Sequence, residues 1–212
     1  DLHTLPDHVV IQINETHPAL AIPELMRILM DEEGFGWDEA YQIVKKMFHY
    51  TNHTIMTEAM ECWDENMFRF LLPRIYQIVC AFNEKYCNKI RAYYSHDEEK
   101  VRSMAIIGNN EIRMANLCVA VCRRVNGVSN LHGDILKEKI FNSSYRIFPQ
   151  KYLAITNGIT HRRWFGLANQ GLYHLAKEYI KGHILKDYHL FEQFLLYKDD
   201  EEFLKKYSEV KE

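Results

Sequence analysis

Four short polar clusters contain the residue types in this sequence that could do chemistry. Each combines an amide side chain with a hydroxyl, an imidazole or a carboxylate, and the clusters occupy residues 14–17, 52–54, 126–132 and 156–158. Sugar hydroxyls donate and accept hydrogen bonds at once, so this mixture suits a polyhydroxylated ligand, and a buried group left unpaired would cost about 1–3 kcal/mol. These residues alone predict a polar cleft suited to a sugar.

The same residue types also have structural interpretations. Asn, Thr and Gly are common in turns and helix caps, so Thr16 could simply cap a helix. Three histidines could be core residues with satisfied hydrogen bonds, namely His17, His53 and His132. No H-x-x-x-H or H-E-x-x-H spacing links these histidines, so no metal site is predicted.

Two pairs of like charges are open to similar alternatives. Glu58 and Glu61 lie near a predicted helix start, where carboxylates interact favourably with the helix dipole without any catalytic role. Arg162 and Arg163 would suit either a bound anion or plain solvation. The sequence has no G-x-S-x-G motif and no recognisable cysteine nucleophile. A two-carboxylate glycosidase stays open, because carboxylate separation cannot be read from a sequence.

Strands that alternate with helices must hold these clusters in place. A β-branched run at residues 9–14 predicts a buried strand, and shorter candidates follow at residues 50–54, 104–107, 125–128 and 152–156. Helical spacing of apolar residues accounts for most of the rest, which predicts a helix-rich α/β fold with a mostly parallel sheet. Ligands of such sheets bind beyond the carboxyl ends of the strands, where the four clusters are expected to lie.

The strongest periodic signal is a long amphipathic helix. Apolar residues recur at steps of three and four from Phe68 to Tyr93, with Asp64 as the predicted N-cap and Pro73 as a kink or a late start. Helical segments are predicted for the remainder of the chain after residue 158. The predicted domain junction lies at Asn157 and Gly158.

Composition excludes several classes of protein. The 212 residues carry a net charge of −3, which does not favour nucleic acid or an anionic membrane as a partner. Glycine makes up about 4% of the residues, against a typical value of about 7%. None of the glycines lies in a standard nucleotide-phosphate loop motif. Five cysteines without metal-ligand spacing are expected to be buried reduced thiols, which predicts a cytoplasmic location. The sequence has no apolar run of about 18 residues, so no membrane span is predicted. Neither terminus carries a start or stop signal, so we expect a piece of a longer protein.

The polar clusters lie in segments that resemble motifs of the α-glucan phosphorylases (glycogen, starch and maltodextrin phosphorylases). Residues 11–29 resemble Q-L-N-D-T-H-P-x-L-A-I-P-E-L-M-R-I-L, and residues 50–59 resemble Y-T-N-H-T followed by E-A-L-E. Residues 125–132 are similar to V-N-G-V-A-x-x-H, and residues 156–164 to T-N-G-I-T-P-R-R-W. The order and spacing match over essentially the whole chain, so the chain resembles a central fragment of such an enzyme.

The resemblance implies a fold of two Rossmann-like domains of the GT-B type that face a deep cleft. Residues 1–156 would be the C-terminal part of the N-terminal domain, and residues 157–212 the start of the C-terminal domain. The implied reaction transfers the terminal α-1,4-linked glucosyl unit of glycogen or maltodextrin to inorganic phosphate, giving glucose 1-phosphate. The implied cofactor is pyridoxal 5′-phosphate, acting through its own phosphate. The implied partners are the glucan, phosphate, the remaining domains of the same protein and a second copy in a homodimer.

Residue roles follow from the resemblance position by position. His53 matches the catalytic-site histidine whose backbone carbonyl and side chain face the glucosyl unit, and Trp164 matches the tryptophan beside the cofactor. Substrate contacts are implied for Asn157, Val128, Glu15, His17 and Thr54.

The sequence departs from the family pattern in two places and lacks one segment. Glu15 replaces the usual Asp, and His161 replaces the Pro that commonly precedes Arg-Arg-Trp. The E-A-S-G-T-x-N-M-K segment with the Schiff-base lysine does not occur, so we expect the chain alone to be inactive and not to bind the cofactor covalently. Two other functions are considered: a non-catalytic glucan-binding or dimerisation module, and a sugar-nucleotide-dependent glycosyltransferase of the same fold type.

Overall fold

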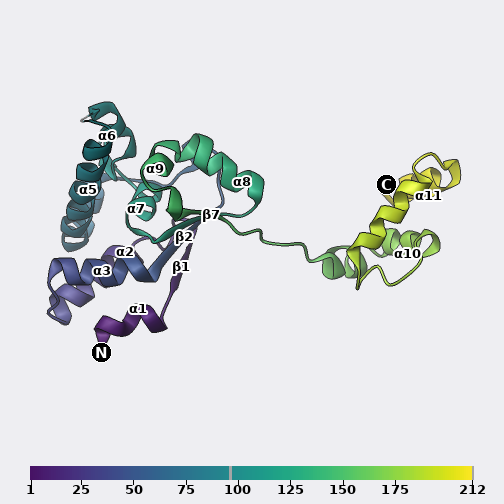
Figure 1. Cartoon of the computed structure of the whole chain (residues 1–212), viewed down its shortest axis with the longest axis horizontal. Helices are drawn as coiled ribbons and strands as arrows, with labels where there is room; N and C mark the ends of the chain where they lie inside the picture. The colour runs from purple at the N-terminus through teal and green to yellow at the C-terminus, as the bar shows by residue number, and fades with distance from the viewer. Residues whose placement is uncertain (96, 212) are drawn as a thin grey trace. The chain divides into compact units, whose positions relative to one another are not determined.

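The computed structural model describes residues 1–95 and 97–211 and forms two compact units (Figure 1). The first unit comprises Asp1–Asn157 and the second Gly158–Glu212. The boundary falls where Gly158 has a φ of +77°, a backbone conformation that glycine adopts at little cost. The assignment of these units to two domains of the family fold stays a prediction.

A parallel four-stranded sheet lies at the centre of the first unit. Its strands are β1 (Ile11–Asn14), β2 (Phe48–Asn52), β6 (Arg124–Gly127) and β7 (Tyr152–Ala154), and they lie side by side in that order. All three strand pairs are parallel. The predicted helix-rich α/β fold with a mostly parallel sheet is therefore confirmed.

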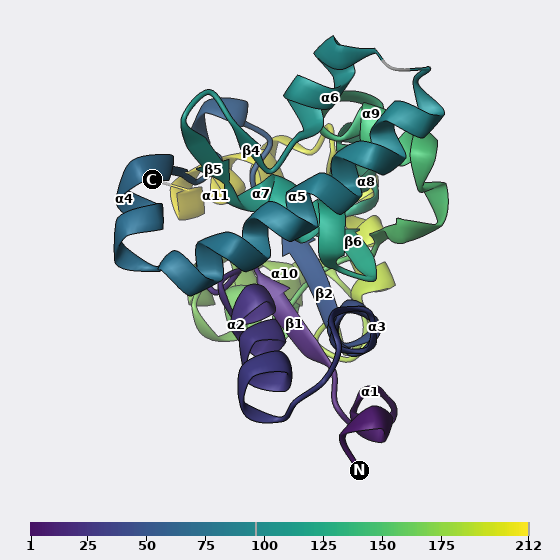
Figure 2. The same ribbon diagram turned by 90° about the vertical axis from the view of Figure 1, so that its left-hand side faces the viewer.

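The connecting helices cover one face of this sheet. They are α2 (Ala21–Arg27), α3 (Trp37–Met47), α4 (Glu65–Leu71), α5 (Pro73–Tyr93), α6 (Glu98–Met104), α7 (Met114–Val121), α8 (Asn130–Ile135) and α9 (Asn142–Ile147). A short helix α1 (Leu5–His8) precedes the sheet. In the layer over the sheet, α7 packs on β2 and β6, and α5 packs on α7 (Figure 2).

The strand order explains why one face is covered and the other is open. The strands follow one another across the sheet without a reversal, and right-handed crossovers then place every connection on the same side. The register puts one apolar residue from each strand in a row on the covered face: Ile13, Tyr50, Val125 and Tyr152. All four are buried. The opposite face carries mainly polar side chains, and it is half-exposed or exposed.

The predicted long helix is divided in two by Pro73. Asp64 caps α4, and its carboxylate accepts a hydrogen bond of 2.7 Å from the backbone N–H of Met67. Leu72 leaves the helical conformation, with φ −132° and ψ 60°, because the proline ring disfavours helical geometry in the preceding residue. Helix α5 then begins at Pro73, where a missing N–H costs nothing. The N-cap prediction and the late start are both confirmed.

A second, antiparallel sheet corrects the strand predicted at residues 104–107. Met104 ends α6, and the strand β4 is only Ile107–Gly108, paired with β5 (Glu111–Arg113), which also pairs with β3 (Cys62–Asp64). Asn109 and Asn110 both have positive φ, 57° and 60°. This is the conformation of a two-residue hairpin loop, and Asn is one of the few residues that tolerate it.

The cysteines form no disulfide among the described residues. Cys87, Cys118 and Cys122 are buried, as predicted, whereas Cys80 is half-buried. Cys62 is exposed, so its predicted burial is wrong, because β3 belongs to the small second sheet at the surface.

The regular structure of the second unit is helical in the described residues, as predicted for residues after 158. It contains a π-helical turn (Arg162–Leu167), α10 (Gln170–Tyr179), a 3-10 segment (Tyr188–Tyr197) and α11 (Glu201–Lys211). Its small core consists of Ala176, Ile180 and Ile184.

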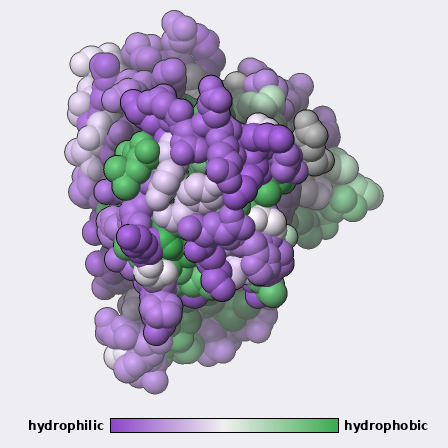
Figure 3. Space-filling model, turned by 90° about the vertical axis from the view of Figure 1, so that its right-hand side faces the viewer, coloured by the Kyte–Doolittle hydropathy of each residue, from purple (hydrophilic) through white to green (hydrophobic). Residues whose placement is uncertain are grey.

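The molecular surface in Figure 3 is mostly hydrophilic, with hydrophobic residues in separate areas. Within the described chain, none of the helices combines the length and the apolar character needed to cross a membrane.

Candidate functional site

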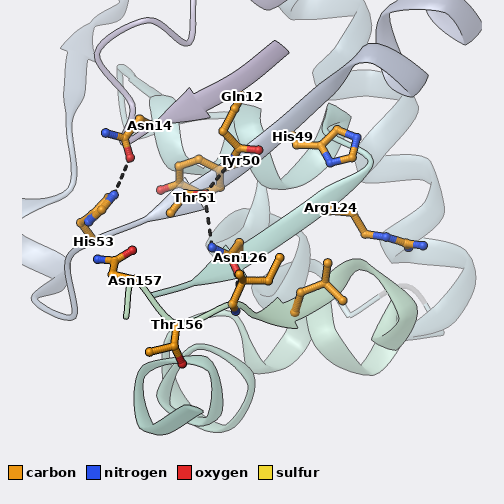
Figure 4. A pocket seen from close by; sticks show the side chains of 12 residues that line it. Gln12, Asn14, His49, Tyr50, Thr51, His53, Arg124, Asn126, Thr156 and Asn157 are labelled. Atoms are coloured by element: carbon orange, nitrogen blue, oxygen red, sulfur yellow. Dashed lines mark hydrogen bonds between the residues drawn. The ribbon is translucent and has the colours of Figure 1, made fainter. Parts of the chain in front are cut away.

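A cavity of about 310 Å³ lies on the open face of the parallel sheet and reaches the carboxyl ends of its strands (Figure 4). At one end of the cavity, Asn14, His53 and Asn157 lie close together, and His49 and Arg124 lie at the other end. The sequence predicts a cleft beyond the strand ends. The cavity reaches those strand ends and, in addition, extends along the open face of the sheet, because the strand order leaves that face without a covering helix.

The floor of the cavity includes a row of polar side chains that crosses β1, β2 and β6, and Leu153 of β7 continues the row. Asn14 pairs with Thr51, and Thr51 with Asn126, in the strand register. The Thr51 hydroxyl accepts hydrogen bonds from the side-chain amides of Gln12 (2.5 Å) and Asn126 (3.4 Å). The side-chain oxygen of Asn126 in turn accepts a hydrogen bond of 2.8 Å from the backbone N–H of Ile155. These hydrogen bonds join β1, β2 and β6 across the open face, and the last one holds the start of the loop after β7 against β6.

Glu15 connects the loop after β1 to the loop after β2. Its carboxylate accepts a hydrogen bond from the backbone N–H of His53, and its own N–H donates to the Thr51 carbonyl at 2.9 Å. The His53 ring contacts the Asn14 side chain at 2.5 Å through Nε2. Glu15 adopts a φ of 62°, which is uncommon outside glycine and turns its side chain toward His53. The structure thus brings the first two polar clusters together.

Glu61 makes a long-range contact beside the site that the sequence does not predict. Its sequence position suggests a helix-start carboxylate, but it lies just before β3 and accepts hydrogen bonds from the Thr16 hydroxyl (2.5 Å) and the Trp63 indole N–H (2.9 Å). His17 Nδ1 lies 3.9 Å from the same carboxylate. Thr16 therefore binds Glu61 instead of capping a helix. The sequence signal for this contact is weak, because the partners are 45 residues apart.

The third cluster contributes backbone and one buried imidazole. The Ser129 side chain caps α8 by accepting a hydrogen bond from the His132 N–H, so this helix begins at Asn130. His132 is buried, and its Nδ1 accepts a hydrogen bond of 3.1 Å from the Val128 N–H. The Val128 carbonyl accepts from the Asn157 N–H at 3.1 Å. Val128 therefore positions Asn157, which lines the cavity.

Only two of the seven predicted site residues, His53 and Asn157, line this cavity; the other five are Glu15, His17, Thr54, Val128 and Trp164. The Thr54 hydroxyl accepts a hydrogen bond from the Met56 N–H in its own loop. Trp164 belongs to the second unit, where it lies in the π-helical turn with 68% of its surface exposed. His161, the departure before Arg-Arg-Trp, contacts the Leu185 carbonyl at 3.2 Å within that unit.

The cavity is uncharged at its sheet-face end apart from Arg124. Partial burial, together with the charges of Arg123 and Arg124, lowers the pKa of His49, so this imidazole is neutral at neutral pH. Among the described residues, no group of three or more His, Cys, Asp and Glu side chains is arranged to hold a metal ion. Amides, hydroxyls and imidazoles of this kind bind neutral polyhydroxylated molecules.

Replacing Glu15 by alanine is expected to loosen the loop that carries His53. The substitution removes the acceptor of the His53 N–H, and because this bond is solvent-exposed we expect a loss of about 1 kcal/mol, or about fivefold faster exchange of the His53 amide. Hydrogen exchange measured by NMR would show this. Glu33→Gln, on an exposed residue elsewhere in the unit, is the control; equal exchange in both variants would contradict the role of Glu15.

Comparison with known proteins now identifies the family. The model of the family described as "Carbohydrate phosphorylase" matches residues 1–212. The chain belongs to the carbohydrate phosphorylase family. It is 43% identical over 212 residues to the brain form of glycogen phosphorylase from Rattus norvegicus, covering 99% of this chain and 25% of that protein. It is 41% identical over 210 residues to the muscle form from Oryctolagus cuniculus, covering 98% and 25% respectively.

This carbohydrate phosphorylase chain spans about a quarter of the length of the curated relatives it matches. The resemblance seen in the four polar clusters is thereby confirmed at the level of the family. The roles of His53, Asn157, Val128, Glu15, His17, Thr54 and Trp164 stay predictions.

Proposed function

We propose that this chain forms the glucosyl-binding side of an α-glucan phosphorylase. The complete enzyme would transfer the terminal α-1,4-linked glucosyl unit of a glucan to inorganic phosphate and release glucose 1-phosphate. The relatives named above are glycogen phosphorylases, which supports a glucan and phosphate as substrates. The cytoplasmic location, the homodimer and the contribution of further domains belong to the same proposal.

The observation that carries this proposal is the meeting of three polar clusters at one end of the sheet-face cavity. His53 would face the glucosyl ring through its backbone carbonyl and its imidazole, while Asn157 would bind a glucosyl hydroxyl through its amide. Val128 would act beside this pocket by holding Asn157 in place, since its carbonyl accepts a hydrogen bond from the Asn157 N–H. Glu15 would orient His53 through the backbone N–H, since its longer side chain, compared with Asp, reaches that group.

A side pocket would adjoin this centre. His17 is exposed and lies beside Glu61, whose two carboxylate oxygens are already hydrogen-bonded to Thr16 and Trp63. The Glu61 carboxylate therefore fixes the loop after β1 relative to β3. Thr54 would act through the conformation of its loop, because its hydroxyl accepts from Met56.

We expect that the described residues do not by themselves hold pyridoxal phosphate. Trp164 offers one exposed aromatic face, but no unengaged buried amine accompanies it in residues 158–211. The buried lysine of the first unit, Lys151, donates hydrogen bonds to the carbonyls of Val119 and Ala120. We therefore assign to this chain the binding and orientation of the sugar, and derive no step through the cofactor.

A chimeric enzyme tests the proposed function. The chain would replace the matching quarter of the Rattus norvegicus brain form, and phosphorolysis of glycogen would be measured as release of glucose 1-phosphate. We expect activity, and we expect Asn157→Ala to lower kcat/KM about tenfold through one lost hydrogen bond to the sugar. The matched control is Asn130→Ala, at the exposed start of α8.

Two results would contradict the proposal. A chimera that binds glycogen and cofactor without phosphorolysis would indicate a non-catalytic glucan-binding module. A chimera that transfers glucose only from a nucleotide sugar would indicate a sugar-nucleotide-dependent glycosyltransferase.

The isolated chain is expected to show neither phosphorolysis nor a specific cofactor adduct. Lys151, whose pKa burial lowers to about 8, would be an unusually reactive lysine if it were accessible, but only 7% of it is exposed. Incubation with pyridoxal phosphate, reduction with borohydride and peptide mapping would reveal any adduct. We expect only low labelling spread over surface lysines; a stoichiometric adduct at one lysine would show that the chain carries its own cofactor site.

A further inference from the structure

A second cavity, of about 200 Å³, lies at the amino end of the parallel sheet, away from the candidate glucosyl site. Five cationic side chains line it, together with Ala120, Phe148 and Gln150: Lys45, Lys89, Arg123, Arg124 and Lys151. They come from the end of α3, from α5 and from the segments that lead into β6 and β7. The tertiary fold therefore gathers cations that are far apart in the sequence, and only Arg124 borders both cavities.

The positive charge of this basic cavity is not neutralised by the protein. None of its lining residues is acidic, and none of the five cations forms an ion pair within the described chain. Arg124 and Lys151 donate hydrogen bonds to backbone carbonyls, at 2.6 Å to Gln150 in the case of Arg124. The side chains of Lys45, Lys89 and Arg123 have no protein partner in the described residues.

Burial and mutual repulsion act on two of the lysines that line the basic cavity. Burial lowers the pKa of Lys89, and the charges of Lys45 and Lys85 lower it further. Burial also lowers the pKa of Lys151, and Lys45 and Lys89 add to this effect. A bound anion would offset both the repulsion and the cost of burying the ammonium groups.

The size and the donors of the cavity select a small, multiply charged ligand. Its volume lies below the range of about 300–1,000 Å³ typical of pockets for drug-sized molecules. Arginine forks and lysine ammonium groups match the geometry and charge of phosphate oxygens. We propose that this basic cavity binds a phosphate group, either free inorganic phosphate or the phosphate of a small monoester. This proposal stands independently of the proposed phosphorylase function, since it uses a different edge of the sheet.

Phosphate titration of the 212-residue chain tests the proposal. Calorimetry at low ionic strength would measure binding of inorganic phosphate and, in a separate arm, of glucose 6-phosphate as the monoester. We expect saturable binding to one site, and a loss of about five- to tenfold in affinity for Lys45→Gln and for Arg123→Gln, because each removes one charge-assisted contact. Stronger binding of the ester would identify a monoester as the ligand, and equal or weaker binding would identify the free ion.

The neighbouring residue on α3 provides a matched control. Lys46 is exposed and does not line the cavity, so Lys46→Gln removes the same charge from the same helix and should change affinity less than twofold. Circular dichroism would establish that each variant is folded. The proposal is overturned if neither probe saturates at millimolar concentration, or if Lys46→Gln weakens binding as much as Lys45→Gln, which would indicate a diffuse charge effect.

Discussion

Substitution of Gly127 by alanine is expected to destabilise the first unit by about 3 kcal/mol. A Cβ at this position, the last of β6, would lie 2.7 Å from the backbone nitrogen of Gly133 and 2.8 Å from its Cα. Both atoms belong to the backbone of α8, so no side-chain rotation can relieve the clash. The helix must move away from the sheet, and Val128 and His132 must move with it.

Urea unfolding of the variant would measure this effect. Gly34→Ala is the control: Gly34 has a φ of +75° but no atom within 4 Å of the added Cβ, so it reports only the backbone cost of about 1 kcal/mol. If Gly127→Ala lowers the free energy of unfolding no more than Gly34→Ala does, the inference that α8 packs closely on β6 is wrong. A larger loss would confirm that glycine is needed for the helix to approach the strand.

Lys151→Met is expected to remove a pH dependence of stability between about pH 8 and 10.5. Burial lowers the pKa of Lys151 from 10.5 to about 8. Between these values the unfolded chain binds a proton that the folded chain does not, so the free energy of unfolding of the wild type rises with pH. The full rise attributable to this lysine is about 3 kcal/mol. Below about pH 8 both states are protonated, and the contribution is constant.

The measurement is the difference in unfolding free energy between wild type and Lys151→Met across that pH range. Taking the difference cancels the titration of thiols and tyrosines, which both proteins share. Lys46→Met, at an exposed position of α3, is the parallel control. A flat difference for Lys151→Met would mean that its ammonium group stays fully charged, held by the carbonyls of Val119 and Ala120 at the carboxyl end of α7.

Local features of the fold could be predicted because their causes are local. The β-branched run at residues 9–14 indicates β1, and the preference of proline for a first helical turn places the start of α5 at Pro73. The hairpin at Asn109–Asn110 is also local, but the sequence does not predict it, because its strands have only two or three residues. Such short strands give too few residues for an alternating pattern to stand out.

Contacts within the site could not be predicted in the same way. Glu61 looks like any helix-start carboxylate in the sequence, and only folding brings it to Thr16. Glu15 reaches the His53 N–H because its backbone adopts a positive φ, which no side-chain preference for glutamate predicts. The five cations of the basic cavity are spread from residue 45 to residue 151, so no local charge run reveals them.

The sequence by itself determined the residue types of the polar clusters, the helix-rich α/β class and, through the motifs, the resemblance to phosphorylases. Only the tertiary structure decided that the strands lie in the sheet in their sequence order. This order places helices on one face of the sheet and leaves a polar cavity on the other. The physical reason is the range of the interactions. Propensity and periodicity act over a few residues, whereas strand order, Glu61 and the basic cavity depend on contacts between distant segments.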